Sequence, residues 1–160
     1  MKKILTVVFL LIMVFSVNSF ALFSVGVLGG SYSMGGSSVT AIGLEASVPF
    51  SIIPLMKTNI QVLTGTYNDA SFMPVMVQQS ISIPFAGVYG GLEAGYISAT
   101  VSGQSAGVIT YGGFVGYEMP LGMAKAFGEV SYDIIPLSQI SSSADDESVL
   151  VLKAGARIGL

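Results

Sequence analysis

A strict alternation of apolar and polar positions marks the final stretch of the chain, residues 148–160. Every second position carries Leu150, Leu152, Ala154, Ala156, Ile158 or Leu160, and the positions between carry Val151, Lys153, Gly155, Arg157 and Gly159. A period of two is that of a β-strand, whose successive side chains point to opposite faces. In a soluble sheet the apolar face would cover a core, whereas in a transmembrane barrel it would face lipid. The environment of this face therefore decides the fold.

Seven earlier segments show the same alternation and are separated by clusters of Gly, Ser, Asn or Pro, a pattern typical of an all-β protein. We expect strands at about residues 23–34, 39–50, 57–67, 72–85, 87–101, 108–121, 123–134 and 148–160. Pro49, Pro84 and Pro120 lie at the ends of the even-numbered strands at spacings of 35 and 36 residues. Because proline cannot donate to a β-ladder, it belongs at a strand end. The three prolines therefore mark one end of the sheet, where the turns are short.

The amino-terminal segment has the features of a secretory signal peptide. Lys2 and Lys3 precede an apolar run from Ile4 to Val17, and Ser19-Phe20-Ala21 supplies small residues for cleavage. The run has 14 residues, fewer than the roughly 20 that a spanning helix needs. We expect a signal peptide over residues 1–21, with an uncleaved anchor as the alternative, and a single domain over residues 22–160.

The composition favours a membrane environment. Charged residues make up 9% of the chain, against about 25% in a typical soluble domain. No other apolar run is long enough for a spanning helix. Because a chain in lipid must satisfy all its backbone polar groups, only helices and closed barrels can span a membrane. The expected fold class is therefore all-β, an eight-stranded antiparallel up-and-down transmembrane β-barrel.

The charged residues avoid every predicted lipid face. Five lie in or beside predicted connections: Lys57, Asp69, Asp145, Asp146 and Glu147. Eight lie on the opposite face of their strand: Glu45, Glu93, Glu118, Lys125, Glu129, Asp133, Lys153 and Arg157. An Arg or Lys exposed to lipid near the midplane costs about 2–4 kcal/mol, so a membrane barrel requires this distribution.

The eight lumen-facing charges are the candidate site. The interior of an eight-stranded barrel is just wide enough for its own side chains. We therefore expect a buried charge network with a structural role, in which Arg157 is the hub because a guanidinium can hold carboxylates bidentately. A gated proton or ion path is the alternative role.

Several functions are excluded or disfavoured by the residue types present. The chain has no His and no Cys, which removes Ser-His-Asp machinery, cysteine nucleophiles and ordinary zinc or haem sites. We expect no enzyme activity, cofactor or metal; a carboxylate pair for acid–base chemistry, Glu118 with Glu129 or Glu129 with Asp133, is the alternative.

Beyond residue 21 the chain keeps four basic and nine acidic residues, which argues against nucleic acid as a partner. Asp145-Asp146-Glu147 is interpreted as a solvated loop tip, with a divalent-cation site as the alternative.

With its leader, eight strands, short turns and polar lumen positions, the chain resembles the small outer-membrane barrels of the OmpA/OmpX type over residues 23–160. It differs from them in ending on Leu160 rather than an aromatic residue and in having short outer loops. The resemblance implies a location in the outer membrane of a diderm bacterium. It also implies a structural or envelope-integrity role or a narrow pore, a monomer, and outer-membrane lipid and the barrel-assembly machinery as partners.

Two other architectures compete with the barrel. The first is a secreted or periplasmic soluble β-sandwich that serves as a binding or adhesion module. Its outward faces would be Gly, Ser and Thr with few charges, which gives poor solubility. The second is a low-charge β protein that polymerises as a surface fibre.

Overall fold

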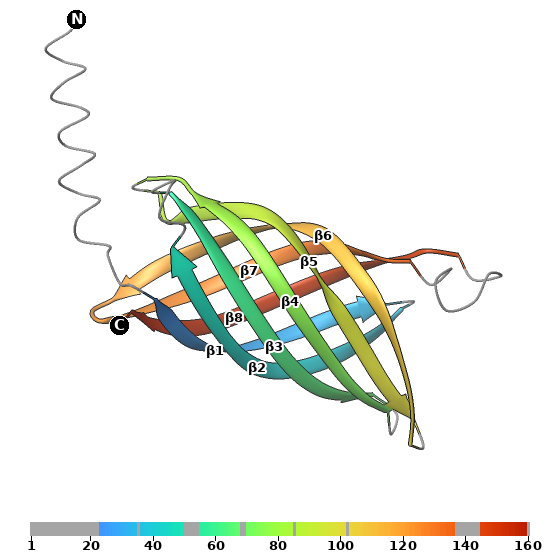
Figure 1. Ribbon diagram of the computed structural model, residues 1–160. Helices are drawn as coiled ribbons and strands as arrows, with labels where there is room; N and C mark the ends of the chain where they lie inside the picture. The colour runs from blue at the N-terminus through green and yellow to red at the C-terminus, as the bar shows by residue number, and fades with distance from the viewer. Residues whose placement is uncertain are drawn as a thin grey trace, which may run out of the picture.

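The computed structural model describes residues 23–34, 36–49, 55–67, 70–84, 86–101, 103–136 and 145–159. The strands are β1 (Ser24–Met34), β2 (Ser37–Pro49), β3 (Met56–Tyr67), β4 (Ala70–Ser82), β5 (Val88–Val101), β6 (Gln104–Leu121), β7 (Ala124–Ile135) and β8 (Glu147–Gly159). They form one closed barrel in which β8 pairs with β1 (Figure 1). Every neighbouring pair is antiparallel. The predicted fold class is confirmed, and the two-sheet sandwich is wrong because a single sheet closes on itself.

No helix among the described residues is long and apolar enough to cross a membrane. The predicted signal peptide, residues 1–21, lies outside the described part of the chain.

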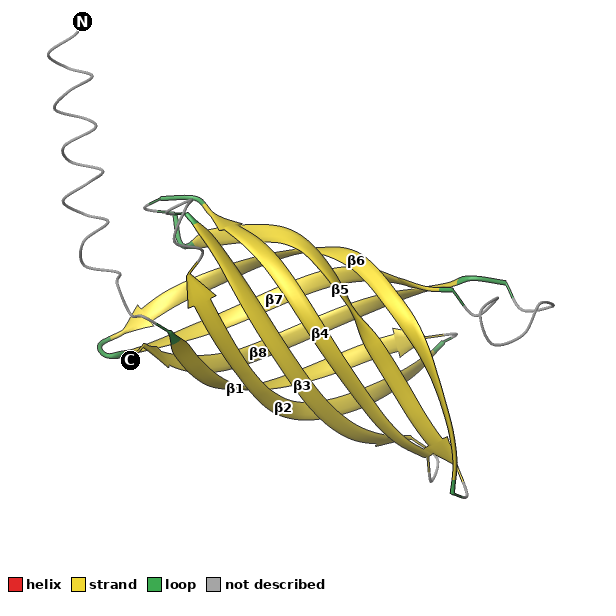
Figure 2. Cartoon of the chain, in the orientation of Figure 1, coloured by secondary structure: helices red, strands yellow, loops and turns green. Residues whose placement is uncertain are grey.

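The barrel has two ends, at which the strands are connected in turn (Figure 2). At the end where β1 begins and β8 ends, here called the turn end, the chain connects β2 to β3, β4 to β5 and β6 to β7. At the opposite end, here called the loop end, β1 connects to β2, β3 to β4, β5 to β6 and β7 to β8. The strand bounds leave six, five and two residues between strands at the turn end, and two, two, two and eleven at the loop end. The prediction that the short turns gather at the proline end is therefore wrong for two of its three connections, because the loop-end strands extend further than their composition indicates.

The loop-end hairpins are tighter than the sequence pattern predicts. β2, β4 and β6 begin at Ser37, Ala70 and Gln104, two to four residues before the expected starts. Gly36 and Gly103 have φ angles of 83° and 82°, which a residue without Cβ adopts at little cost and which two-residue hairpin turns require. Ser and Gly residues whose composition is typical of a loop therefore belong to the strands, and the β-ladder continues up to the turn.

Alternation along each strand separates two faces. On β2, the side chain of Ile42 is 67% exposed, whereas that of the adjacent Ala41 is 1% exposed. The rest of β2 alternates in the same way, with exposed Leu44 beside buried Glu45. The exposed face is apolar, as a membrane barrel requires and a soluble protein avoids.

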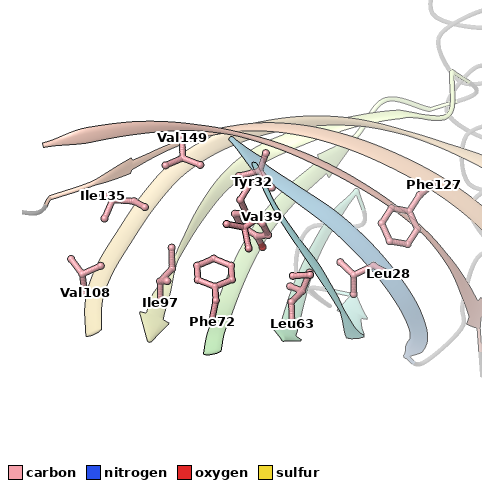
Figure 3. Close-up of a cluster of buried hydrophobic side chains, with 12 residues drawn as sticks. Leu28, Tyr32, Val39, Leu63, Phe72, Ile97, Val108, Phe127, Ile135 and Val149 are labelled. Atoms are coloured by element: carbon pink, nitrogen blue, oxygen red, sulfur yellow. The ribbon is translucent and has the colours of Figure 1, made fainter. Parts of the chain in front are cut away.

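A cluster of buried apolar side chains lies in the lumen, mostly toward the loop end, with Phe127 nearer the turn end beside Arg157 (Figure 3). Its members are Leu28, Tyr32, Val39, Ala41, Leu63, Phe72, Ile97, Val108, Phe127, Ile135, Val149 and Val151. Tyr32 and Phe72 pack edge to face with ring centroids 5.1 Å apart. A lumen lined throughout by polar residues is therefore not observed, because large apolar side chains occupy many of the lumen positions.

Proline also occurs inside a strand. Pro74 lies in β4, where pairing with β3 is interrupted between the Val62–Val75 and Gly65–Phe72 pairs. On its other side Pro74 still opposes Ile97 of β5. Since proline lacks an N–H, the ladder breaks on one side only, and the barrel stays closed.

Candidate functional site

A polar cluster fills most of the lumen on the side of the turn end, and Asp133 extends it toward the loop end. Its buried members are Glu45, Ser47, Asn59, Gln61, Gln78, Ser80, Tyr89, Glu93, Glu129, Ser131, Asp133, Lys153 and Arg157. They come from β2, β3, β4, β5, β7 and β8, each at an inward position of its strand. The alternation of the strands therefore directs side chains from distant parts of the sequence to one point.

Glu129 connects the two cations of this cluster. Its Oε1 accepts a hydrogen bond of 2.8 Å from the Tyr89 hydroxyl and lies 3.8 Å from Arg157 Nη2. Its Oε2 accepts a hydrogen bond of 3.0 Å from Gln78 Nε2 and lies 3.6 Å from Lys153 Nζ. Both cations of the cluster therefore meet at one carboxylate, which shares with Arg157 the role of hub.

Lys153 is a deeply buried cation, with a side chain 1% exposed. Its Nζ donates to Glu93 Oε2 at 2.9 Å and to Gln61 Oε1 at 3.1 Å. An ammonium without a partner could not be held at this depth, because burial of an unpaired charge costs several kcal/mol. The contacts with Glu93 and Glu129 compensate that cost.

Arg157 combines ion pairs with aromatic packing. Its Nη1 lies 3.2 Å from Glu45 Oε1, and its Nη2 donates to the Tyr89 hydroxyl at 3.1 Å. The guanidinium carbon lies 4.0 Å from the centre of the Phe127 ring. A planar guanidinium suits both kinds of contact, which an ammonium would not make equally well.

Glu118 and Lys125 form a separate group at the turn end. Lys125 Nζ donates to Glu118 Oε1 at 2.8 Å. Lys57 Nζ lies 3.6 Å from the same oxygen. The sequence pattern placed Lys57 at the edge of a connection, but the structure places it inside β3 and facing the lumen mouth.

Asp133 forms no ion pair with a described Lys or Arg. It is buried, and its Oδ1 has no hydrogen-bond partner among the described residues. The eight charges identified from the sequence thus divide into a deep group (Glu45, Glu93, Glu129, Lys153 and Arg157), a mouth group (Glu118 and Lys125) and Asp133.

Uncharged amides connect the charges, and sequence reasoning did not assign them to the site. Ser47 Oγ donates to Asn59 Oδ1 at 2.6 Å, and Gln61 Nε2 donates to Glu45 Oε2 at 2.8 Å. Gln78 Nε2 donates to Glu93 Oε2 at 2.9 Å. The available signal was that these amides occupy the same face as the carboxylates of neighbouring strands.

The contacts within the polar cluster favour a structural role over a catalytic one. Of the carboxylates considered for acid–base catalysis, Glu118 lies with the mouth lysines, and Glu129 contacts two cations and a tyrosine. The described part of the chain contains no group of three or more His, Cys, Asp and Glu that could hold a metal ion. What the cluster can do is join six strands across the lumen.

Comparison with known proteins gives matches in structure only. No protein-family model and no curated protein matches the chain. Neisserial surface protein A superposes with a TM-score of 0.60 at 11% identity, over 86% of this chain and 96% of that chain. The N-terminal β-barrel domain of Pseudomonas aeruginosa OprF gives 0.56 at 10% identity, over 84% and 97%. A major outer membrane protein from Thermus thermophilus gives 0.54 at 12% identity, over 85% and 98%.

The chain has the fold of the small eight-stranded outer-membrane barrels. The resemblance inferred from the sequence is thereby confirmed at the level of fold. The matches cover nearly the whole of each related chain, so the likeness extends to the complete barrel and is not confined to one hairpin.

Proposed function

We propose that this protein is a structural component of the outer membrane of a diderm bacterium, a closed barrel that supports the integrity of the envelope and does not conduct. The observation that carries the proposal is the filling of the lumen. Large side chains from the polar cluster (Gln61 and Gln78) and from the apolar cluster (Leu63 and Val151) are almost completely buried.

The filling is held in place by paired charges. Opening a path through the polar cluster would separate Lys153 and Arg157 from Glu93, Glu45 and Glu129. Breaking a buried pair typically costs about 3–5 kcal/mol. Ions would also have to cross the apolar cluster, which offers no hydration. A narrow pore, the alternative function, would have to overcome both barriers.

The loop end argues against a role as an adhesin or receptor. Three of its four connections consist of two residues each. Connections of this length supply few residues, whereas a standard protein–protein interface buries about 800 Å² on each side. The barrel wall therefore represents most of the surface available to a partner, and membrane lipid is the partner that this wall fits.

Planar-bilayer recordings of the purified barrel test the proposal directly. We expect no unitary conductance steps above the lipid baseline at up to about 100 mV of applied potential, a field that contributes only about 2.3 kcal/mol per charge. Reproducible, voltage-dependent steps from the folded protein would establish the pore instead.

A second experiment addresses the cellular role. Cells without the protein should become more sensitive to detergents and bulky antibiotics, and the intact chain should restore resistance. Leu152→Arg, which places a charge on the lipid face, is the matched control and should not restore it. Recovery of the mature chain in the soluble fraction without detergent would contradict the membrane location. Light scattering of the detergent-solubilised barrel measures its mass and tests the expected monomer.

A further inference from the structure

We propose that the lumen mouth at the turn end binds one small oxyanion, a phosphate or carboxylate group, between the ammonium groups of Lys57 and Lys125. The proposal goes beyond the structural role and does not depend on it. It concerns a recess lined by Phe23, Ser24, Ser47, Pro49, Lys57, Lys125, Arg157 and Gly159.

The recess exists because three adjacent lumen positions carry small residues. Ser24 of β1 pairs with Ser47 of β2 on one side and with Gly159 of β8 on the other. Lys57 and Lys125 extend over the mouth from β3 and β7. The resulting volume is about 70 Å³, and a single water needs only about 10–15 Å³. The recess therefore has room for one small anion but not for a peptide or a sugar chain.

The charges around the recess do not balance. Lys57 and Lys125 approach the same oxygen of Glu118, at 3.6 and 2.8 Å, so two ammonium groups share one carboxylate. Their side chains are 31% and 41% exposed, which leaves them accessible to a ligand from solution. One anion between them would neutralise the mouth, and an ammonium can donate three hydrogen bonds.

A third cation lies against the recess. Arg157 lines it and is only 4% exposed, and its Nη atoms contact Glu45 and Tyr89. Its Nε has no hydrogen-bond partner among the described residues and almost no accessible surface, so Arg157 adds positive charge beside the recess while the two lysines make the contacts to the anion.

The opposite end of the barrel has the opposite charge. Its described charged residues are Asp145, Asp146 and Glu147, and no described Lys or Arg lies there. An anion would be repelled at the loop end and attracted at the turn end. Within the described residues, the turn-end mouth thus has the positive charge, the ammonium donors and the volume that binding of one small anion requires.

Titration with inorganic phosphate, followed by backbone amide NMR, tests the site. The folded chain is held in an uncharged detergent, and sodium chloride at matched ionic strength serves as the blank. We expect saturable shifts at Ser24, Ser47 and Lys57 and none at Val149 in the apolar cluster. Lys57→Gln combined with Lys125→Gln should weaken binding roughly tenfold or more, because two charge-assisted contacts are lost.

Glu118→Gln is the matched control. It removes the carboxylate that competes for both lysines and should tighten phosphate binding roughly threefold or more. A retained, dispersed amide spectrum shows that each variant is folded, and the two single lysine variants replace the double variant if it does not fold. Equal responses to phosphate and chloride, a double variant that binds like the parent, or weaker binding by Glu118→Gln would each overturn the proposal.

Lipid nanodiscs distinguish the two sources of a phosphate group. If an anionic lipid headgroup occupies the mouth, discs of phosphatidylglycerol should shift the mouth amides without added phosphate, compared with discs of phosphatidylcholine. If a soluble anion is the ligand, the mouth amides should move only on addition of phosphate, in both kinds of disc. Mouth amides that stay unchanged under all these conditions would refute the site.

Discussion

Glu129 shows how much a single side chain in this lumen can hold together. It comes from β7 and contacts Tyr89 of β5, Gln78 of β4 and two cations of β8. Neither cation depends on it alone, because Lys153 also meets Glu93 and Arg157 also meets Glu45. Each cation therefore has a second carboxylate partner. Glu129 is the residue that links the contacts of Lys153 to those of Arg157.

Replacing Glu129 with glutamine should destabilise the folded barrel by about 2–4 kcal/mol, less than the full loss of a buried ion pair because each cation keeps one partner. The new amide group would also place a donor against the donors of Gln78, Lys153 or Tyr89. Urea unfolding in lipid vesicles measures the change. Lys125→Gln is the control at the partly exposed mouth and should cost no more than about 1 kcal/mol. Equal losses for the two variants would show that the deep network adds nothing beyond a surface pair.

Within the strands, glycine permits close approach of neighbouring backbones. A Cβ added to Gly43 of β2 would overlap the carbonyl oxygen of Val62 and lie 2.7 Å from the Cα of Leu63 in β3. A Cβ added to Gly29 of β1 would meet only the Ala41 carbonyl oxygen, at 3.8 Å. At these two positions, therefore, the lumen-facing side is crowded by the neighbouring backbone, while the outward side has space.

Gly43→Ala should therefore destabilise the barrel by about 1–3 kcal/mol, the usual cost of overpacking a site that cannot relax. Gly29→Ala should be neutral or stabilising by up to about 1 kcal/mol, since alanine reduces the entropy of the unfolded chain. Unfolding of both variants in the same vesicles measures the difference. A smaller loss for Gly43→Ala than for Gly29→Ala would mean that the neighbouring backbone crowds Gly43 less than described.

The two faces of β8 should respond differently to polar substitution. Leu152 is exposed near the middle of the strand, so Leu152→Arg should block insertion into vesicles, with a cost of about 2–4 kcal/mol. Val151 lies in the apolar cluster, so Val151→Thr should insert but lose about 1–3 kcal/mol for a buried hydroxyl without a partner. Gel migration of the folded form and urea unfolding distinguish the outcomes. Equal tolerance at both positions would show that the facing of β8 is wrong.

The barrel as a whole is closed by two layers in series, one apolar and one polar. Phe72→Ala should cost about 3–5 kcal/mol in stability, as truncation of a buried aromatic does. It should not open a path, because Gln61 and Gln78 still fill the next layer. Adding Gln61→Ala and Gln78→Ala should produce measurable conductance in planar bilayers. Conductance by Phe72→Ala alone would mean that the apolar layer is the only barrier.

Eight strands, their outward faces and the inward position of every predicted lumen charge could be predicted from the sequence. The reason is local: side chains alternate with a period of two, and lipid excludes charge from one of the two faces. The strand starts at the loop end could not be predicted in this way. Ser and Gly residues have the composition of a loop, and only pairing across a two-residue turn makes them strand.

The partners inside the lumen depended on the tertiary structure. Lys153 donates to Gln61, 92 residues away, and no local pattern connects β8 with β3. The contact exists because closure of the sheet between β1 and β8 sets the stagger of all eight strands, and the stagger decides which inward side chains meet across the lumen. The sequence alone therefore determined that a barrel forms and which residues face inward. Closure decided that Glu129 links Lys153 to Arg157 and that Lys57 joins the mouth.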